Sequence, residues 1–215
     1  MENKKEEQTY VSEKKKIVEN RSYIDSKFKS RLDHTGIKYF REIARDGNCM
    51  YLAIGVQIVD KLQTNPEFKE KFNKTLEDLI EKFKSLNLEE FTYSDYMNTL
   101  KENMDVEIQK IDKYSWYEIV GLLRLITSTE LRINKEMYLP YIPDITIEQY
   151  CKSQVDPFFV EAGYLEIGAL VNILPIQIEV IDITEQTSNY SRMYGNEGEV
   201  ISILHTPNHF EAVYY

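Results

Sequence analysis

The strongest constraint on how this chain folds is a long apolar stretch that begins at a cysteine. Residues 49–62 read CMYLAIGVQIVDKL and are apolar on all sides of a helix almost to its end. A helix without a polar face is typical of the interior of a domain. The stretch follows Asp46-Gly47, a turn signal, and Asn48, a residue type that often caps helices. We therefore expect a central buried helix that starts at Cys49, with Asn48 as its cap.

Further helices are expected around this central one. Residues 66–86 place apolar side chains three and four positions apart, the period of an amphipathic helix, and Pro66 suits a first helical turn. The same kind of spacing predicts helices at 94–110, 115–132, 146–151 and 164–173, with Asp144 or Thr146 as a helix cap.

The apolar period changes near the C-terminus. Apolar and polar residues alternate from 176 to 180, as in a half-buried strand. Residues 200–204 and 210–215 predict two more strands, separated by the turn-forming sequence HTPNH. Helices followed by strands favour an α+β fold with a small, mainly antiparallel sheet packed between helices.

The length of 215 residues suits one domain with a short extension. Lysines and glutamates alternate in residues 1–24, where apolar residues are few. We interpret this stretch as a charged N-terminal arm, helical or frayed, in front of a domain at 25–215. A solvated face is the simplest role for these charges, and contact with a partner is the alternative.

The net charge of −10 and the pI of about 5.0 argue against a nucleic-acid partner, whose phosphates require a basic surface. A basic partner fits better, although an acidic balance often serves only solubility. The first twenty residues lack the apolar core of a signal peptide, and no stretch approaches the ~18 apolar residues of a membrane span. We expect a soluble cytoplasmic protein, with the nucleus as a second compartment.

Cys49 is the first residue that could carry chemistry. A thiol at a helix N-terminus faces unpaired backbone N–H groups and the positive end of the helix dipole, which favour the thiolate form. The same N–H groups, with those of the Asp46-Gly47 turn, could receive the oxyanion that forms when a carbonyl is attacked. A lone cysteine beside an apolar helix is, however, more often a core residue. Neither Cys49 nor Cys151 lies at zinc or disulfide spacing, so we expect two reduced thiols.

A base for this thiol could come from the other end of the chain. His209 enters the last predicted strand, and Glu211 follows two residues later, which places both side chains on one face. A carboxylate in that position can hold the imidazole in the tautomer that accepts a thiol proton. Taken alone, such a pair is more often solvated surface. The cysteine and the histidine indicate a nucleophile and its base only when they are considered together.

Two stretches resemble a known family. The segment YFREIARDGNCMYLAIG is similar to the nucleophile segment of the ovarian-tumour (OTU) cysteine peptidases, and HTPNHFEAVYY resembles their histidine strand. The resemblance runs from about residue 20 to the C-terminus. Several intervening segments resemble the otubain branch in particular: LEEFTYSDYMNTL, IVGLLRLITSTELR and TIEQYCKSQVDPFFVEAGYLEIGALVNILPIQIEVID.

This resemblance implies a papain-like OTU fold and the activity of a deubiquitinase that needs no metal or cofactor. Cys49 matches the nucleophile of the family and His209 its general base. Asp46 matches the acidic residue of the loop that forms the oxyanion hole. Glu211 stands where otubains usually have Asp, and its longer side chain leaves its geometry open. Met50 replaces a more usual aromatic residue, for which we expect a mild change in packing.

The resemblance also names the expected partners. They are ubiquitin and polyubiquitin chains, with a ubiquitin-conjugating enzyme as a further partner, and the protein is expected to be a monomer. Two alternatives stay open at this point. The same fold could bind ubiquitin or a conjugating enzyme without cutting, or the catalytic site could act on a ubiquitin-like modifier.

Overall fold

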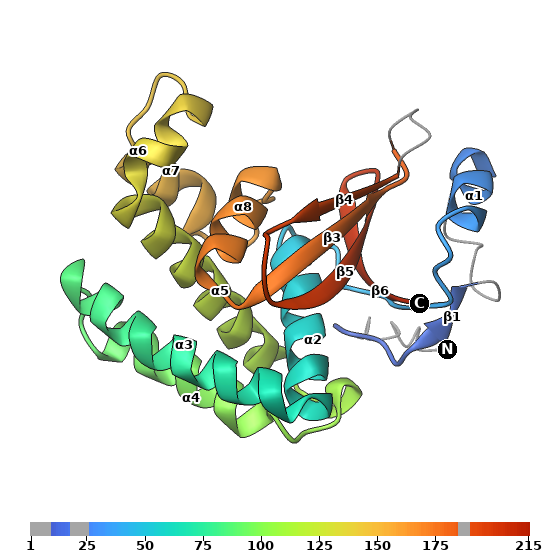
Figure 1. The fold of residues 1–215 in the computed structure, drawn as a ribbon, viewed down its shortest axis with the longest axis horizontal. Helices are drawn as coiled ribbons and strands as arrows, with labels where there is room; N and C mark the ends of the chain where they lie inside the picture. Colours follow the sequence, from blue (N-terminus) through green and yellow to red (C-terminus); the bar gives the residue numbers. More distant parts are fainter. Residues whose placement is uncertain (1–9, 18–25, 185–189) are drawn as a thin grey trace, which may run out of the picture.

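The protein is described here by a computed structural model that covers residues 10–17, 26–184 and 190–215. Helices occupy the middle of the chain, and most strands lie toward its C-terminus (Figure 1). The elements, in chain order, are β1 (Lys15–Lys16), α1 (Ser26–Asp33), β2 (Tyr39–Arg41), α2 (Cys49–Thr64), α3 (Pro66–Ser85), α4 (Phe91–Asn103), η3 (Ile108–Lys110), α5 (Lys113–Ile133), α6 (Lys135–Tyr138), η4 (Leu139–Tyr141), α7 (Ile147–Tyr150), the π-helical turn η5 (Cys151–Val155), α8 (Tyr164–Ile173), β3 (Ile176–Asp182), β4 (Ser191–Tyr194), β5 (Glu199–Thr206) and β6 (His209–Tyr214).

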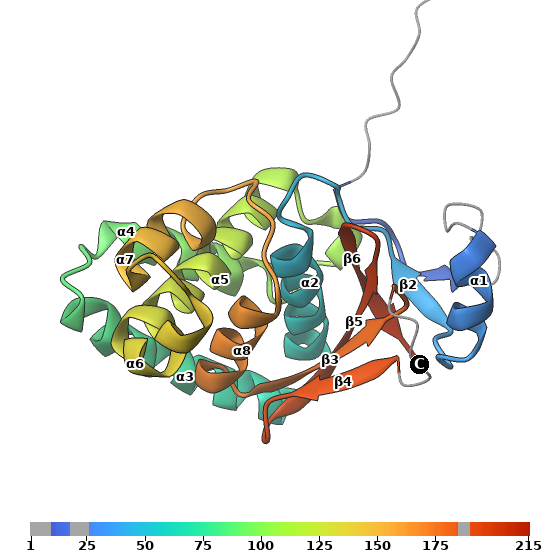
Figure 2. The same cartoon turned by 90° about the horizontal axis from the view of Figure 1, so that it is seen from above.

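The strands form one sheet in the order β1-β2-β6-β5-β3-β4. Neighbouring strands are antiparallel except β3 and β5, which are parallel because β4 returns along the other edge of β3 before β5 begins. Helix α2 packs on one face of the sheet, and α1 lies on the other side (Figure 2). Side chains of α1, Phe28 and Leu32, bury against Phe40 and Val213 of the sheet. The predicted α+β fold, a mainly antiparallel sheet between helices, is confirmed.

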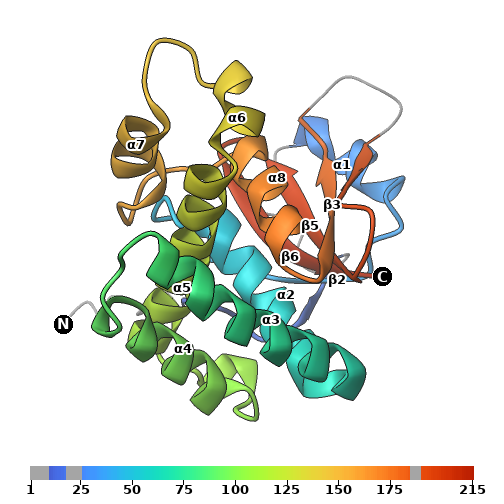
Figure 3. The same cartoon turned by 60° about the vertical axis from the view of Figure 1, so that its left-hand side comes forward.

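Helix α2 is the centre of the molecule, as its sequence predicts. All its residues from Cys49 to Val59 are buried, and burial of each large aliphatic side chain contributes about 1.5–3 kcal/mol. Gln57 is a polar residue within this stretch. Its Nε2 donates to the carbonyl oxygens of Ser202 (2.8 Å) and Val213 (2.7 Å), which ties α2 to β5 and β6. Helices α3 and α4 lie beside α5, on the side away from the sheet (Figure 3).

The helices predicted at 66–86, 115–132 and 164–173 are present as α3, α5 and α8. Thr146 caps α7 in a capping box. Its side chain accepts from the backbone N–H of Gln149, and the Gln149 side chain accepts from the backbone N–H of Thr146. The continuous helix predicted at 94–110 is wrong. Helix α4 ends at Asn103, and a turn leads to the short 3-10 helix η3, because Asn103 and Asp105 are residue types that favour turns over helix interiors.

The N-terminal arm differs from its prediction. Its described part, residues 10–17, is neither helical nor frayed: Tyr10, Val11 and Ile17 are buried, and β1 pairs with β2. The reason is that these apolar residues, sparse in the sequence, reach the core when the segment adds to the open edge of β2. The rest of the predicted arm lies outside the described residues.

Within the described ranges, none of the helices combines the length and the apolar character needed to cross a bilayer.

Candidate active site

The cysteine and the turn before it form the first half of the site. Cys49 is the first residue of α2 and is 7% exposed. Asn48 precedes it, but the expectation that its side chain caps α2 is wrong, because no such hydrogen bond exists. Its Oδ1 instead accepts from Arg124 Nη2 (2.8 Å) and from the backbone N–H of Phe159 (3.0 Å). The first N–H groups of α2, which have no partner within a helix, are therefore not covered by the Asn48 side chain.

The histidine and the glutamate form the second half, on β6. His209 Nε2 lies 3.0 Å from Glu211 Oε1, and the two side chains are only 1% and 2% exposed. The other carboxylate oxygen of Glu211 accepts from the backbone N–H of Ile43 at 2.8 Å. The 3.0 Å contact is an ion pair whose direction falls short of a regular hydrogen bond. Contact through Nε2 leaves Nδ1 of His209 available to Cys49.

His209 interacts with both halves of the site, because Cys49 and Glu211 both affect the pKa of its imidazole. Burial alone lowers the pKa of this imidazole, but the nearby Cys49 and Glu211 side chains outweigh burial and raise the pKa to about 9. Burial raises the pKa of Glu211, against the opposing effect of His209. At neutral pH His209 is therefore an imidazolium beside the sulfur of Cys49. Cys49 therefore lies beside a buried imidazole that can exchange a proton with the atoms of a reaction at the sulfur.

Asp46 belongs to the turn before the nucleophile rather than to the histidine. Its Oδ1 accepts from the backbone N–H of Asn48 (3.0 Å), and its Oδ2 accepts from the hydroxyl of Tyr10 (3.0 Å). Between them, Gly47 adopts φ +83°, and a Cβ at this position would lie 2.3 Å from the carbonyl oxygen of Phe159. Glycine is required here both by the backbone conformation and by this close approach. The turn is therefore held from two sides.

Arg124, on α5, is a residue of the site that sequence reasoning missed. It is buried, and its guanidinium donates to Asn48 Oδ1 (2.8 Å) and to the carbonyl oxygens of Val155 (2.9 Å) and Val160 (2.8 Å). It also lies 4.6 Å from the ring centroid of Tyr51. An arginine inside the apolar run LLRLI was the available signal, because a charge is buried only when it is well paired. Arg124 joins the turn to the 155–160 loop.

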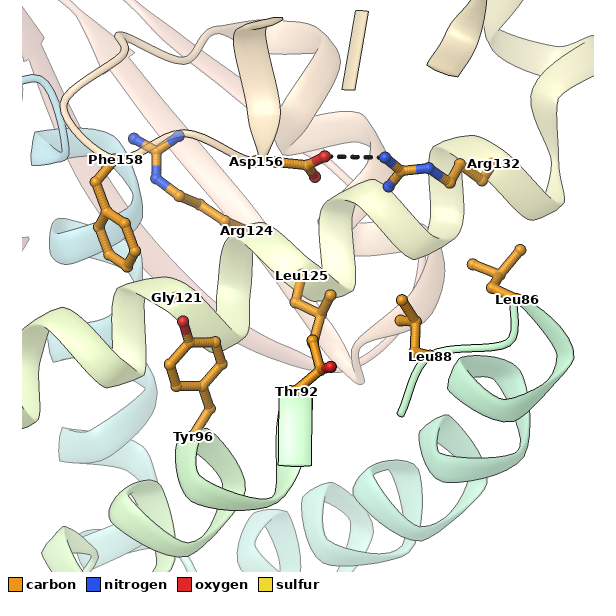
Figure 4. Close-up of a pocket in the computed structure, with 10 residues that line it drawn as sticks. All are labelled: Leu86, Leu88, Thr92, Tyr96, Gly121, Arg124, Leu125, Arg132, Asp156 and Phe158. Carbon is orange, nitrogen blue, oxygen red and sulfur yellow. Dashed lines mark hydrogen bonds and ion pairs between the residues drawn. The ribbon is translucent and has the colours of Figure 1, made fainter. Parts of the chain in front are cut away.

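A cavity of about 370 Å³ lies behind this arginine (Figure 4). Arg124 and Phe158 lie near each other at one end of the lining, and the ion pair between Arg132 and Asp156 (2.9 Å) lies along one side of it. The remaining lining residues are Leu86, Leu88, Thr92, Tyr96, Gly121 and Leu125. Arg124 is shared between this cavity and the site, because it lines the cavity and bonds Asn48.

The second cysteine lies apart from this chemistry. Cys151 is fully buried in the cluster under α6 and α7, and burial raises the pKa of its thiol to about 11. It is therefore a neutral thiol at physiological pH, in line with a structural role. Among residues 10–17, 26–184 and 190–215, no group of three or more His, Cys, Asp or Glu side chains gathers as metal ligands would.

Comparisons with known proteins agree on one family. The family model described as Peptidase C65 Otubain matches residues 3–215. Ubiquitin thioesterase OTUB1 of Homo sapiens is 28% identical over 200 residues, which cover 84% of this chain and 72% of the relative. Ubiquitin thioesterase otubain-like of Caenorhabditis elegans is 26% identical over 193 residues, 81% of this chain and 68% of the relative.

Solved structures show the same fold. A complex of h/ceOTUB1 with ubiquitin aldehyde and UBC13~Ub matches with a TM-score of 0.80 at 23% identity, covering 96% of this chain and 91% of that chain. The OTU domain of OTUD1 matches with a TM-score of 0.51 at 15% identity, covering 88% of this chain and 93% of that chain.

Proposed function

This chain belongs to the peptidase C65 family, the otubains, and we propose that it is a cysteine deubiquitinase that hydrolyses isopeptide bonds at the C-terminus of ubiquitin. The observation that carries the proposal is the buried constellation of Cys49, His209 and Glu211, assembled from the head of α2 and from β6. A thiol paired with an imidazole that a carboxylate orients is the arrangement needed for acyl transfer.

The first chemical step is addition to the carbonyl of the terminal glycine of ubiquitin. The Cys49 sulfur forms a bond to the carbonyl carbon, and the carbonyl oxygen takes up the negative charge. Backbone N–H groups at the start of α2, with those of the Asp46–Asn48 turn other than the N–H of Asn48 that Asp46 holds, are the groups placed to bind this oxyanion. Removal of one oxyanion donor typically costs about 10²–10³ in rate, so the position of this turn matters.

The second step releases the amine. The carbon–nitrogen bond breaks as imidazolium His209 donates its proton to the departing lysine amine, which leaves a thioester on Cys49. Water then attacks the thioester while neutral His209 accepts a proton from it. The sulfur–carbon bond breaks, the C-terminal carboxyl group of ubiquitin leaves and gives its remaining proton to solvent, and the thiolate and the imidazolium are restored. Glu211 keeps Nε2 occupied, so that Nδ1 faces the reacting atoms throughout.

The partners follow from the relatives. Human OTUB1 is named a ubiquitin thioesterase, and a matching structure holds ubiquitin aldehyde and UBC13~Ub. We assign ubiquitin chains to this protein as substrate and a ubiquitin-conjugating enzyme as a further partner. The net charge of −10 is compatible with the arginines in the tail of ubiquitin. The monomeric state and the cytoplasmic and nuclear locations stay predictions from the sequence.

A panel of all diubiquitin linkages, incubated with the wild type and with Cys49→Ala, tests the proposal. We expect the wild type to cleave at least one linkage and Cys49→Ala to cleave none. Cys151→Ala is the matched control, because it removes the only other thiol of the chain and should keep activity.

A ubiquitin probe with a C-terminal electrophile should label the wild type and the control, and it should not label Cys49→Ala. A folded wild type that binds ubiquitin but neither cleaves a linkage nor reacts with the probe would favour a non-catalytic binding module. Cleavage of a ubiquitin-like modifier alone, in parallel assays, would change the substrate and keep the chemistry.

A further inference from the structure

The segment of residues 10–17, here called the N-terminal strap, runs along the segment that leads to the nucleophile. Backbone hydrogen bonds join the two segments in both directions. The N–H of Ser12 donates to the carbonyl oxygen of Glu42, and the N–H of Ala44 donates to that of Tyr10, both at 3.0 Å. The Ser12 hydroxyl also accepts from the backbone N–H of Glu42 at 2.8 Å. The strap therefore sets the position of the chain between β2 and the turn before Cys49.

This same stretch of chain serves both halves of the active site. Ile43, which forms an antiparallel bridge with Val11 of the strap, donates its N–H to Glu211. Three residues later the chain reaches Asp46 and the turn that leads into Cys49. The segment that the strap holds in place thus bonds the carboxylate behind His209 and leads directly into the turn before the nucleophile.

Tyr10 is the point where the strap touches the turn directly. Its hydroxyl donates to Asp46 Oδ2 at 3.0 Å, while Asp46 Oδ1 accepts from the N–H of Asn48. The Tyr10 ring is 9% exposed and packs edge-on against Tyr117 of α5, with 5.1 Å between ring centroids. Burial, and then the charge of Asp46, raise the pKa of Tyr10, so the phenol keeps the proton that it donates.

We propose that Tyr10 is a positioning residue for acyl transfer: its bond to Asp46 holds the turn before Cys49 in the conformation that receives the oxyanion. Tyr10 acts through Asp46 and does not touch the substrate. A turn with both carboxylate oxygens engaged has less freedom than one held by Asn48 alone. The inference rests on the proposed function, because it names a further residue on which that reaction depends.

The test compares Tyr10→Phe with Tyr114→Phe. The first substitution removes only the hydroxyl and keeps the packed ring, and the second removes a hydroxyl from a tyrosine that is 79% exposed. Hydrolysis of a ubiquitin C-terminal fluorogenic amide gives kcat and KM. Alkylation of Cys49 by iodoacetamide gives a reference rate without an oxyanion, since the sulfur displaces iodide from a saturated carbon.

We expect Tyr10→Phe to lower kcat about tenfold, the loss that corresponds to one hydrogen bond to a charged group. KM and the alkylation rate should stay as in the wild type, because substrate docking and the thiolate are unchanged. Tyr114→Phe should match the wild type in all three quantities. An unchanged kcat in Tyr10→Phe overturns the proposal, and so does an alkylation rate that falls in parallel with kcat.

A second variant checks that the effect runs through Asp46. In an Asp46→Ala background, Tyr10→Phe should cause no further loss of kcat, and a repeated tenfold loss would show that Tyr10 acts elsewhere.

Should the wild type cleave no ubiquitin substrate, the proposed function fails, and a peptide aldehyde that ends in Gly-Gly tests Tyr10 instead. The thiol adds to its carbonyl carbon and the aldehyde oxygen becomes a hemithioacetal oxygen, so Tyr10→Phe should weaken binding about tenfold. Equal affinity would then overturn the inference.

Discussion

Two histidine–carboxylate pairs lie close together on the sheet, and only one of them faces a nucleophile. His209 of β6 contacts Glu211 with 3.0 Å between Nε2 and Oε1. His205 of β5 contacts Asp182 of β3 with 2.9 Å between Nδ1 and Oδ2. By distance and composition the two pairs are nearly equivalent.

Their surroundings separate them. His209 is 1% exposed and lies beside Cys49, which contributes to its raised pKa. The His205 side chain is 22% exposed and stacks on Phe210 at 4.5 Å, and Asp182 also accepts from the hydroxyl of Tyr164 at 2.6 Å. A histidine held by a carboxylate is thus a general structural device. Only the pair with a sulfur beside its imidazole is placed to exchange a proton with the nucleophile in the proposed reaction.

The largest difference is expected when each histidine is replaced in turn. His209→Asn should lower kcat/KM for a ubiquitin substrate by about 10³-fold or more, because the proton donor and acceptor is lost. His205→Asn should leave kcat/KM at the wild-type value, since its ring contacts no reacting atom. Steady-state kinetics on both variants decide the matter. A comparable loss in His205→Asn would mean that the second pair also belongs to the site.

The carboxylates should differ in what they support. Glu211→Gln should lower kcat about 10²-fold, because the imidazolium loses its charged partner. Asp182→Asn should keep kcat but lower the free energy of unfolding by about 1–3 kcal/mol, since a buried acceptor of several hydrogen bonds loses its charge. Kinetics and urea unfolding of the two variants check the separation. If Glu211→Gln and Asp182→Asn lose the same stability and keep the same kcat, the two carboxylates do not differ in role.

The two pairs should also respond to opposite ends of the pH range. The pKa of His209 is raised, so its contribution to stability is complete below its ordinary value near 6.5 and is lost as pH rises through about 9. Asp182 is different: burial raises the pKa of its carboxyl, but hydrogen bonds from Thr184, Tyr164 and His205 outweigh this and lower it. Its contribution is present above the ordinary value of about 4 and is lost below it.

Melting temperatures measured across pH for the wild type and two variants test this contrast. The difference between the wild type and His209→Asn should shrink from pH 6.5 to about pH 9.5, and that between the wild type and Asp182→Asn should shrink below about pH 4. The kcat/KM of the wild type should fall above about pH 9, where His209 no longer carries the proton that the leaving amine needs. Differences that do not depend on pH would contradict both assignments.

The smallest expected effect belongs to Tyr164→Phe. Its hydroxyl donates to Asp182 in the second pair, so its removal should cost about 1 kcal/mol of unfolding free energy. The kcat for a ubiquitin substrate should stay unchanged, in contrast to the tenfold loss expected for Tyr10→Phe. Thermal unfolding and kinetics on the two tyrosine variants compare a hydroxyl that serves stability with one that serves the reaction.

Much of this architecture can be predicted from local patterns. The apolar run after Cys49 predicts α2 because a helix without a polar face must be buried, and the spacing of His209 and Glu211 places them on one face of a strand. Helix α3 follows from its amphipathic period. The break between α4 and η3 could not be predicted, and one continuous helix was expected at 94–110. Helix ends depend on turns, and local residue preferences are too weak to fix where a turn begins.

The supports of the site are what local patterns do not reveal. Arg124 holds Asn48 from 76 positions along the chain, and Tyr10 bonds Asp46 from 36 positions away. The sequence predicted a charged arm at residues 1–24. In the structure, its described part is the strap, which adds a strand to β2 and buries Tyr10. These contacts have no period in the sequence, because they arise between segments that come together only when the sheet and α2 pack.

The sequence by itself determined the chemical groups of this protein and the elements that carry them: a cysteine at the head of a buried helix, and a histidine and a glutamate on the last strand. The tertiary structure alone decided that Arg124 holds Asn48, that the side chain of Asn48 turns away from the helix it precedes, and that the N-terminal segment braces the turn before Cys49. The physical reason is that helix and strand periods are local properties of the chain, whereas burial and hydrogen-bond partners depend on long-range packing.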